Sequence, residues 1–443
     1  MPDDPTDRLD SWKEIAPFIG KDVRTAMRWS RQGMPVHRIP GGKQGRVYSS
    51  RAEITQWLDR HHEEPPTVPP LPPKTNAKLT LIWAAGIGTL LILVVLLAAA
   101  TRLHSGGTVA RVLIEGNTVH AFDAEKREQW SYRFPHDLDP SILGNDHTLA
   151  EFVRIADLRG DGRKEVLLVA PYRLGPNPND TFRVEVDCFS DRGQLLWSFV
   201  PNEQFRFGTH EVGAPWAVHD LFLSHQTQKP VIWVSADHPL WGNSFVAQLD
   251  AATGHETVRF VNTGVIYKIN EMVTPRGTYL LVGGFNNEYE GGSLAIIDER
   301  TPFAASPQTS GTRHQCLSCP EGAPDYYLVF PRSEINEQQR VYEHPVRLIQ
   351  VNGTEIQLVK YELQFQKEGV ATVYLLRASP EIEPVSLRFD SKYDMLHQEL
   401  NAQGKLHHSL RDCPERLHPR PVRLWTPAKG WTTINFNPAG ASD

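Results

Sequence analysis

The chain has 443 residues with 46 basic and 52 acidic side chains, which give a formal net charge of −6. The charge is uneven, because residues 11–60 carry 10 basic and 4 acidic side chains, whereas the remainder of the chain is acidic. A basic segment of this kind suits a polyanionic partner. No Ser/His/Asp order, P-loop or HExxH helix occurs, so these common catalytic motifs are excluded and we do not expect an enzyme.

The first 62 residues predict a small α+β domain. Asp10 or Ser11 is suited to cap a first helix, which stops at Gly20, and Asp22 is suited to cap a second helix. A glycine-rich loop at residues 41–45 permits a tight hairpin. The patterns predict helices over residues 12–19, 23–33 and 50–58, and strands over residues 36–39 and 46–48.

These segments resemble the MerR/excisionase-like winged helix-turn-helix family. The residues that carry the resemblance are SWKEIAPFIGKDVRTAMRWSRQGMPVHRI, the glycine-rich wing and VYSSRAEITQWL. The resemblance implies that the second helix lies in the major groove of double-stranded DNA, where Arg24 and Arg28 read bases. The remaining implied contacts, mostly to phosphates, come from Thr25, Arg31, Lys43 and Arg46. The alternative is that these arginines form an ordinary solvated helix face. Pairing of two such domains in a homodimer would raise the affinity for DNA.

Residues 63–78 are expected to form a proline-rich linker, and residues 79–101 are expected to form one transmembrane helix. The run is uncharged and long enough to cross a hydrocarbon core of roughly 30 Å. A signal peptide would begin near Met1, and a buried core helix would show a polar stripe, so neither alternative fits. We therefore expect a single-pass protein in the lipid bilayer of a bacterial inner membrane, with a cytoplasmic N-terminus and a periplasmic or extracellular C-terminal domain.

Residues 102–443 predict a large all-β domain, because short alternating strands recur between turns at intervals of roughly 40 to 70 residues. The segments resemble PQQ-type quinoprotein and FG-GAP (integrin-type) propeller blades, and LDAATGHE is the closest match. The resemblance implies a β-propeller of six to eight blades, and we expect this domain to sense an unknown ligand or protein. The expected turns lie near Asp123, Ser190, Asp250, Asp298, Asn352 and Asp390.

One segment, DLRGDGRKE, resembles the calcium loop of FG-GAP repeats. Asp157, Asp161 and Glu165 match positions 1, 5 and 9 of that loop and would supply oxygen ligands to Ca²⁺. Arg159 occupies position 3, where its guanidinium could replace the cation. A metal-free structural turn is the alternative that we favour, and no other cofactor is expected.

All four cysteines follow the apolar run: Cys188, Cys316, Cys319 and Cys413. The spacing of Cys316 and Cys319 is typical of a disulfide, a redox pair or a metal knuckle. Zinc would require a second pair of ligands nearby, and c-type haem would require histidine where Pro320 stands. A structural disulfide is favoured, either within this pair or to the other two cysteines.

Together these features predict a membrane-tethered one-component transcription regulator. A DNA reader inside the cell would be coupled through one helix to a β-propeller sensor outside it. The alternative is an exported, membrane-anchored β-propeller that acts as a binding protein or quinoprotein-like enzyme, with an N-terminal domain that binds a protein.

Overall fold

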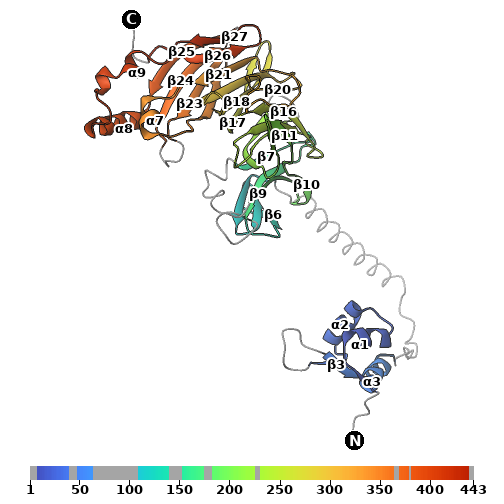
Figure 1. Ribbon diagram of the computed structural model, residues 1–443. Helices are drawn as coiled ribbons and strands as arrows, with labels where there is room; N and C mark the ends of the chain where they lie inside the picture. The colour runs from blue at the N-terminus through green and yellow to red at the C-terminus, as the bar shows by residue number, and fades with distance from the viewer. Residues whose placement is uncertain are drawn as a thin grey trace, which may run out of the picture. The chain divides into compact units, whose positions relative to one another are not determined.

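A computed structural model describes residues 7–38, 47–62, 108–138, 152–173, 182–224, 230–363, 369–378 and 381–438. The chain divides into two compact units, residues 1–99 and residues 100–443. Figure 1 colours the first unit blue and the second unit from cyan to red. Each unit is described by itself.

The first unit packs three helices against a three-stranded sheet of order β1-β3-β2. Asp22 begins α2 because its carboxylate accepts a hydrogen bond of 2.9 Å from the Thr25 backbone N–H. The small core consists mainly of Leu9, Ile15, Ala16, Ala26, Met34, Val47 and Ile54. The elements are β1 (Arg8–Leu9), α1 (Trp12–Phe18), α2 (Val23–Arg31), β2 (His37–Arg38), β3 (Val47–Ser50) and α3 (Arg51–His62).

The expected winged helix-turn-helix class is corrected by this arrangement. Among the described residues, two short helices and a sheet that begins with β1 form no clear helix-turn-helix domain. Assignment to that class of DNA-binding domain is therefore wrong, although the helices begin near the expected caps. Capping patterns specify where a helix starts, but they do not specify how two helices pack.

The second unit is mostly β-sheet, and its first half contains three successive sheets and a ribbon, in which all strand pairs are antiparallel except the parallel pair β16–β20. The sheets have three, four and five strands, with orders β4-β5-β6, β10-β9-β8-β7 and β13-β14-β15-β16-β20. Their strands are β4 (Arg111–Glu115), β5 (Thr118–Phe122), β6 (Glu128–Arg133), β7 (Val153–Ala156), β8 (Glu165–Arg173), β9 (Phe182–Phe189), β10 (Leu195–Phe199), β13 (Ala217–Ser224), β14 (Val231–Asp237), β15 (Ser244–Leu249), β16 (Glu256–Asn262) and β20 (Ala304–Ala305). The ribbon consists of β11 (Phe205–Phe207) and β12 (His210–Val212).

The second half contains a six-stranded and a four-stranded sheet, with orders β17-β18-β19-β21-β26-β27 and β22-β23-β24-β25. Their strands are β17 (Ile266–Thr274), β18 (Gly277–Asn286), β19 (Gly291–Asp298), β21 (Tyr326–Phe330), β22 (Val346–Asn352), β23 (Glu355–Tyr361), β24 (Ala371–Ala378), β25 (Ile382–Phe389), β26 (Val422–Thr426) and β27 (Gly430–Ile434). The helical segments are α7 (Glu334–Gln339), α8 (Ser391–Ala402), η1 (Leu410–Asp412) and α9 (Pro414–Leu417).

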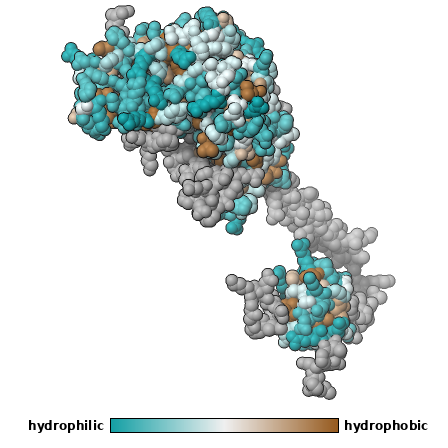
Figure 2. Space-filling view, in the orientation of Figure 1, coloured by the Kyte–Doolittle hydropathy of each residue, from teal (hydrophilic) through white to brown (hydrophobic). Residues whose placement is uncertain are grey.

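Consecutive sheets pack face to face, and each adjacent pair encloses one hydrophobic cluster. At two of these interfaces a tryptophan side chain packs directly against a glycine. An ideal Cβ at Gly193 would lie 2.7 Å from the Trp130 ring, and one at Gly254 would lie 2.5 Å from the Trp197 ring. Both glycines have positive φ, so any larger residue there would clash and be strained. On the face drawn in Figure 2, hydrophobic residues form small separate spots.

The expected propeller of six to eight blades is also corrected. The described strands form sheets of unequal size, and Figure 1 shows β6 of the first sheet and β24 of the last sheet at opposite ends of the unit. In the six-stranded sheet, β21 pairs with β26, although all four strands of the β22–β25 sheet lie between them in the sequence. The sequence pattern predicts the repeated hairpins, but it does not predict which distant strands pair.

Most of the expected turns occur where polar side chains accept backbone hydrogen bonds. Asp123 accepts from the Arg127 N–H at 2.8 Å, and Asp250 accepts from the Thr253 N–H at 2.9 Å. The turn expected at Asp390 is different, because this residue caps α8 instead of joining two strands. The buried positions of α8, Tyr393, His397 and Leu400, have helical spacing that a strand interpretation missed.

The predicted location in a bacterial membrane is corrected as well. Within the described ranges, no helix is both long and apolar enough to span a bilayer. The linker 63–78 and the predicted span 79–101, on which that location depended, lie outside the described residues.

Candidate functional site

A surface cavity of about 500 Å³ lies within the second unit. Its walls come from the β11–β12 ribbon, the β14–β15 turn, the start of β17, the end of β18, the loop before β21 and the segment after α7. The residues that the argument uses are His210, Trp241, Tyr267, Asn287, His314 and Tyr342. Cavities of this size, lined by aromatic and a few polar groups, are typical of small-molecule sites.

Exposed aromatic side chains form one wall of this cavity. The rings of His210 and Trp241 stack with centroids 5.1 Å apart and an interplanar angle of 28°. Trp241 is 46% exposed and Tyr342 is 44% exposed, although large aromatic side chains are usually buried. Such exposed rings provide flat apolar surface to a ligand.

Polar contacts hold these rings in place. The side-chain amide of Asn287 donates a hydrogen bond of 3.3 Å to the Trp241 carbonyl. The Tyr342 hydroxyl donates to the Asn287 carbonyl at 3.5 Å, so Asn287 links Trp241 to Tyr342. At the base, the Tyr267 hydroxyl donates to the Glu343 carboxylate at 3.0 Å.

Two histidines, His314 in the cavity lining and His219 beside the lining residue Asp237, have pKa values shifted in opposite directions. His219 lies 2.7 Å from the Asp237 carboxylate, and Asp237 lines the cavity. Burial opposes protonation of His219, but the charge and hydrogen bond of Asp237 outweigh it and raise the pKa. Burial, with the nearby Arg313 guanidinium, lowers the pKa of His314. Asp237 and Arg313 both line the cavity, so it offers an acidic and a basic hydrogen-bonding group.

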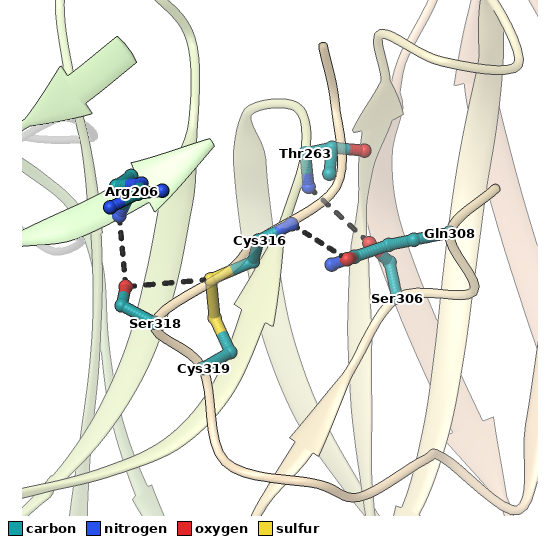
Figure 3. The surroundings of a disulfide bond; sticks show 7 residues. All are labelled: Arg206, Thr263, Ser306, Gln308, Cys316, Ser318 and Cys319. Atoms are coloured by element: carbon teal, nitrogen blue, oxygen red, sulfur yellow. Dashed lines mark hydrogen bonds between the residues drawn. A yellow bond between two sulfur atoms is a disulfide. The ribbon is translucent and has the colours of Figure 1, made fainter. Parts of the chain in front are cut away.

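The loop that supplies Arg313 and His314 to the cavity continues into the Cys316–Cys319 disulfide, whose surroundings are drawn in Figure 3. The Arg206 backbone N–H donates to the Ser318 hydroxyl at 2.8 Å, and the Leu317 N–H donates to the Arg206 carbonyl at 2.7 Å. These bonds fasten the loop to the ribbon that carries His210. The other two cysteines, Cys188 and Cys413, are buried and free.

A second cavity of about 550 Å³ lies where hairpins of the last two sheets end. It is lined by turn residues such as Thr274, Arg276 and Lys429. Among the described residues, its lining has no stacked pair of exposed rings like His210 and Trp241. We therefore take the smaller cavity as the candidate functional site.

The predicted DNA-contacting residues are only partly described. Arg24, Arg28 and Arg31 are exposed on α2. Thr25 is half-buried, and its hydroxyl donates to the Asp22 carboxylate at 2.9 Å as part of the helix cap. Lys43 and Arg46 lie outside the described residues.

The calcium-like loop forms a turn in which a guanidinium contacts the carboxylates. Arg159 lies 2.6 Å from the buried Glu165 carboxylate and 3.9 Å from Asp161. Asp157 accepts three backbone N–H groups, from Gly160, Asp161 and Gly162. These contacts lower the pKa of Asp157, with the bond from Gly162 contributing most. This geometry favours the turn, whereas calcium binding stays a prediction.

Sequence reasoning did not find the cavity residues. They come from six segments between residues 207 and 343, and no spacing pattern connects them. One available signal was PLWGN, residues 239–243, in which two large apolar residues occur within a turn-forming context. Exposed aromatic residues in a turn are a pointer to recognition.

Comparisons with known proteins identify no family. No family model matches the chain, and no curated protein matches it. One solved structure described as "Crystal structure of the eukaryotic initiation factor" is 13% identical, over 73% of this chain and 85% of that chain. Its TM-score is 0.20, which is too low to support an argument about fold or function.

Proposed function

We propose that the second unit is a ligand-binding module that takes up a saccharide in the His210–Trp241 cavity. The observation that carries this proposal is the stacked, half-exposed pair of rings from two separate hairpins. The proposal keeps the sensing role expected from the sequence and gives it a definite site.

The chemistry of the walls favours this ligand class. A sugar ring presents a face of C–H groups, which suits the electron-rich face of an indole. Its hydroxyl groups need both donors and acceptors, and Asn287, His314 and Asp237 supply them around the rings. A purely apolar ligand would leave these polar groups unpaired, at a cost of about 1–3 kcal/mol each.

A thermal-shift screen of the full-length chain tests the proposal. A saccharide at 100 times its dissociation constant stabilises the folded chain by about 2.7 kcal/mol, which raises the melting temperature measurably. Neutral, acidic and amino sugars form the panel, and apolar aromatic compounds of similar size form the comparison. No shift with any sugar, together with a shift for the apolar compounds, would reject a saccharide ligand.

The exposed arginines of α2 support a second proposal, that the first unit contacts double-stranded DNA. Arg24, Arg28 and Arg31 repeat at spacings of four and three, so they share one face of the helix. Solvated guanidiniums on one face can contact successive phosphates. The two proposals together describe a one-component transcription regulator in which ligand binding to one unit controls DNA binding by the other.

A further inference from the structure

Four side chains with metal-ligand chemistry meet beside the last sheet. The ligand atoms of Glu334, His397, His408 and Cys413 all lie within 4.8 Å of one another. They come from α7, α8, the loop after α8, and the junction of η1 and α9. We call these helical segments the helical cap; Figure 1 shows α7, α8 and α9 gathered at one end of the β22–β25 sheet.

The four groups converge on one point. The Nε2 atoms of His397 and His408 lie 3.2 Å apart, and each is 3.1 Å from a carboxylate oxygen of Glu334. The Cys413 thiol lies 3.1 Å from the same carboxylate. Two facing imidazole nitrogens can share only one hydrogen, so at least one of them presents a lone pair. The Glu334 carboxylate presents further lone pairs at the same point, and a cation would accept them.

The geometry points to a structural zinc site formed by Glu334, His397, His408 and Cys413. A tetrahedron with metal–ligand distances of about 2.0–2.3 Å has edges of about 3.3–3.8 Å. The separations given above are 3.1–3.2 Å, and all four ligand atoms lie within 4.8 Å of one another. One thiolate, two imidazoles and one carboxylate form a donor set that zinc accepts. Four protein ligands fill the tetrahedron, which is the pattern of structural rather than catalytic zinc.

The surroundings fit a site that holds the cap together. His397 and Cys413 are buried, whereas the side chains of Glu334 and His408 are 12% and 22% exposed. Ser333 caps α7, and the Glu334 N–H donates to the Glu415 carboxylate at 2.9 Å. These contacts fix the first turn of α7 and with it the Glu334 ligand.

The cap is stabilised by a small hydrophobic cluster and by polar contacts between its segments, such as the hydrogen bond from the Tyr393 hydroxyl to the Glu415 carboxylate at 2.9 Å and the Arg416–Asp394 ion pair. Its hydrophobic cluster contains six buried residues: Ile335, Leu363, Val370, Tyr393, Leu400 and Leu406. Its segments are short, since α7 has six residues and α9 has four. A zinc ion bound by these four ligands would join four segments of the cap, which are otherwise linked by short helices and loops.

The sequence offers a matched pair of histidines for the test. His407 is exposed, whereas the adjacent His408 contributes to the cluster. The full-length chain, made without a polyhistidine tag, is loaded with zinc, dialysed and analysed for metal. We expect about one zinc per chain in the unaltered protein and in His407→Ala, and a loss of at least about tenfold in zinc affinity in His408→Ala and Cys413→Ser.

Cobalt replacement tests the same site without any substitution. The cobalt-loaded chain should show the absorption of a tetrahedral site together with a sulfur-to-cobalt charge-transfer band. Retention of less than about one tenth of a zinc per chain would overturn the proposal, as would equal zinc binding by His407→Ala and His408→Ala. A cobalt spectrum without the sulfur band would also overturn it, because Cys413 would then not be a ligand.

Discussion

The imidazole of His210 stacks on the indole of Trp241, with ring centroids 5.1 Å apart. The two residues come from different hairpins, and Asn287 bonds to the Trp241 carbonyl while the disulfide loop bonds to the His210 ribbon. The aromatic wall is therefore formed before any ligand arrives. Preorganisation of this kind reduces the entropy that binding would otherwise cost.

The disulfide is expected to stabilise both the fold and the ligand site. It closes a loop with a sequence separation of 3, for which chain entropy gives about 2 kcal/mol. Cys316→Ser/Cys319→Ser should weaken ligand binding about tenfold, because the loop that carries Arg313 and His314 loses its fixed position. Titration and denaturant unfolding measure the two effects. Cys188→Ala is the control, and unchanged affinity in the double variant would contradict the role of the loop.

Arg159 is expected to neutralise a buried carboxylate. Glu165 has no exposed side-chain surface, whereas Arg159 is 36% exposed, so solvent reduces the value of the pair. Arg159→Ala should lower the free energy of unfolding by about 1–3 kcal/mol. Arg163→Ala, whose guanidinium lies 3.6 Å from Asp161, should cost less than about 0.5 kcal/mol. Equal losses in chemical denaturation would show that Glu165 does not depend on Arg159.

Glu185 is expected to make stability depend on pH. Burial, with the charge of Asp187, raises the pKa of Glu185 to about 7 from its ordinary value of 4.5. The folded chain then binds more protons than the unfolded chain, so the stability from this residue is lost as pH rises from about 4.5 to about 7. Glu185→Gln should flatten the melting temperature over this range relative to the unaltered chain. Glu125→Gln, an exposed control, should not change the profile, and a steeper profile in Glu185→Gln would refute the assignment.

The cationic face of α2 is expected to bind DNA mainly through phosphates. Arg24→Ala/Arg28→Ala should weaken binding at all sequences and reduce the salt slope by about 1 for each phosphate that is no longer neutralised. Lys13→Ala removes an exposed charge from α1 and serves as the control. Fluorescence anisotropy with duplex DNA at several salt concentrations measures the slope. Binding that is insensitive to salt, or equal losses in both variants, would count against the proposal.

The caps and turns of the fold were easier to predict from the sequence than the pairing and packing of its sheets. Asp22 begins α2 and the Asp123 and Asp250 turns join strands, because each depends on a short polar contact. The pairing of β21 with β26 and the face-to-face row of sheets depend on residues far apart in the chain. The winged helix-turn-helix and propeller assignments failed at this level.

The candidate sites also differ in whether their residues are close together or far apart in the sequence. The Cys316–Cys319 pair was visible because its spacing is local. The His210–Trp241 cavity and the Glu334, His397, His408 and Cys413 cluster were not visible, since each unites distant segments. Glu334 lies far upstream of the other three ligands, so no spacing rule for zinc would have included it.

Calorimetric titration of the full-length chain with the best sugar from the panel tests the central claim most directly. Trp241→Ala should weaken binding by about tenfold or more, because it removes the stacking surface. Leu195→Ala, which removes another exposed apolar side chain, should bind as the unaltered chain does. Equal affinities for the Trp241→Ala and Leu195→Ala variants would contradict the account.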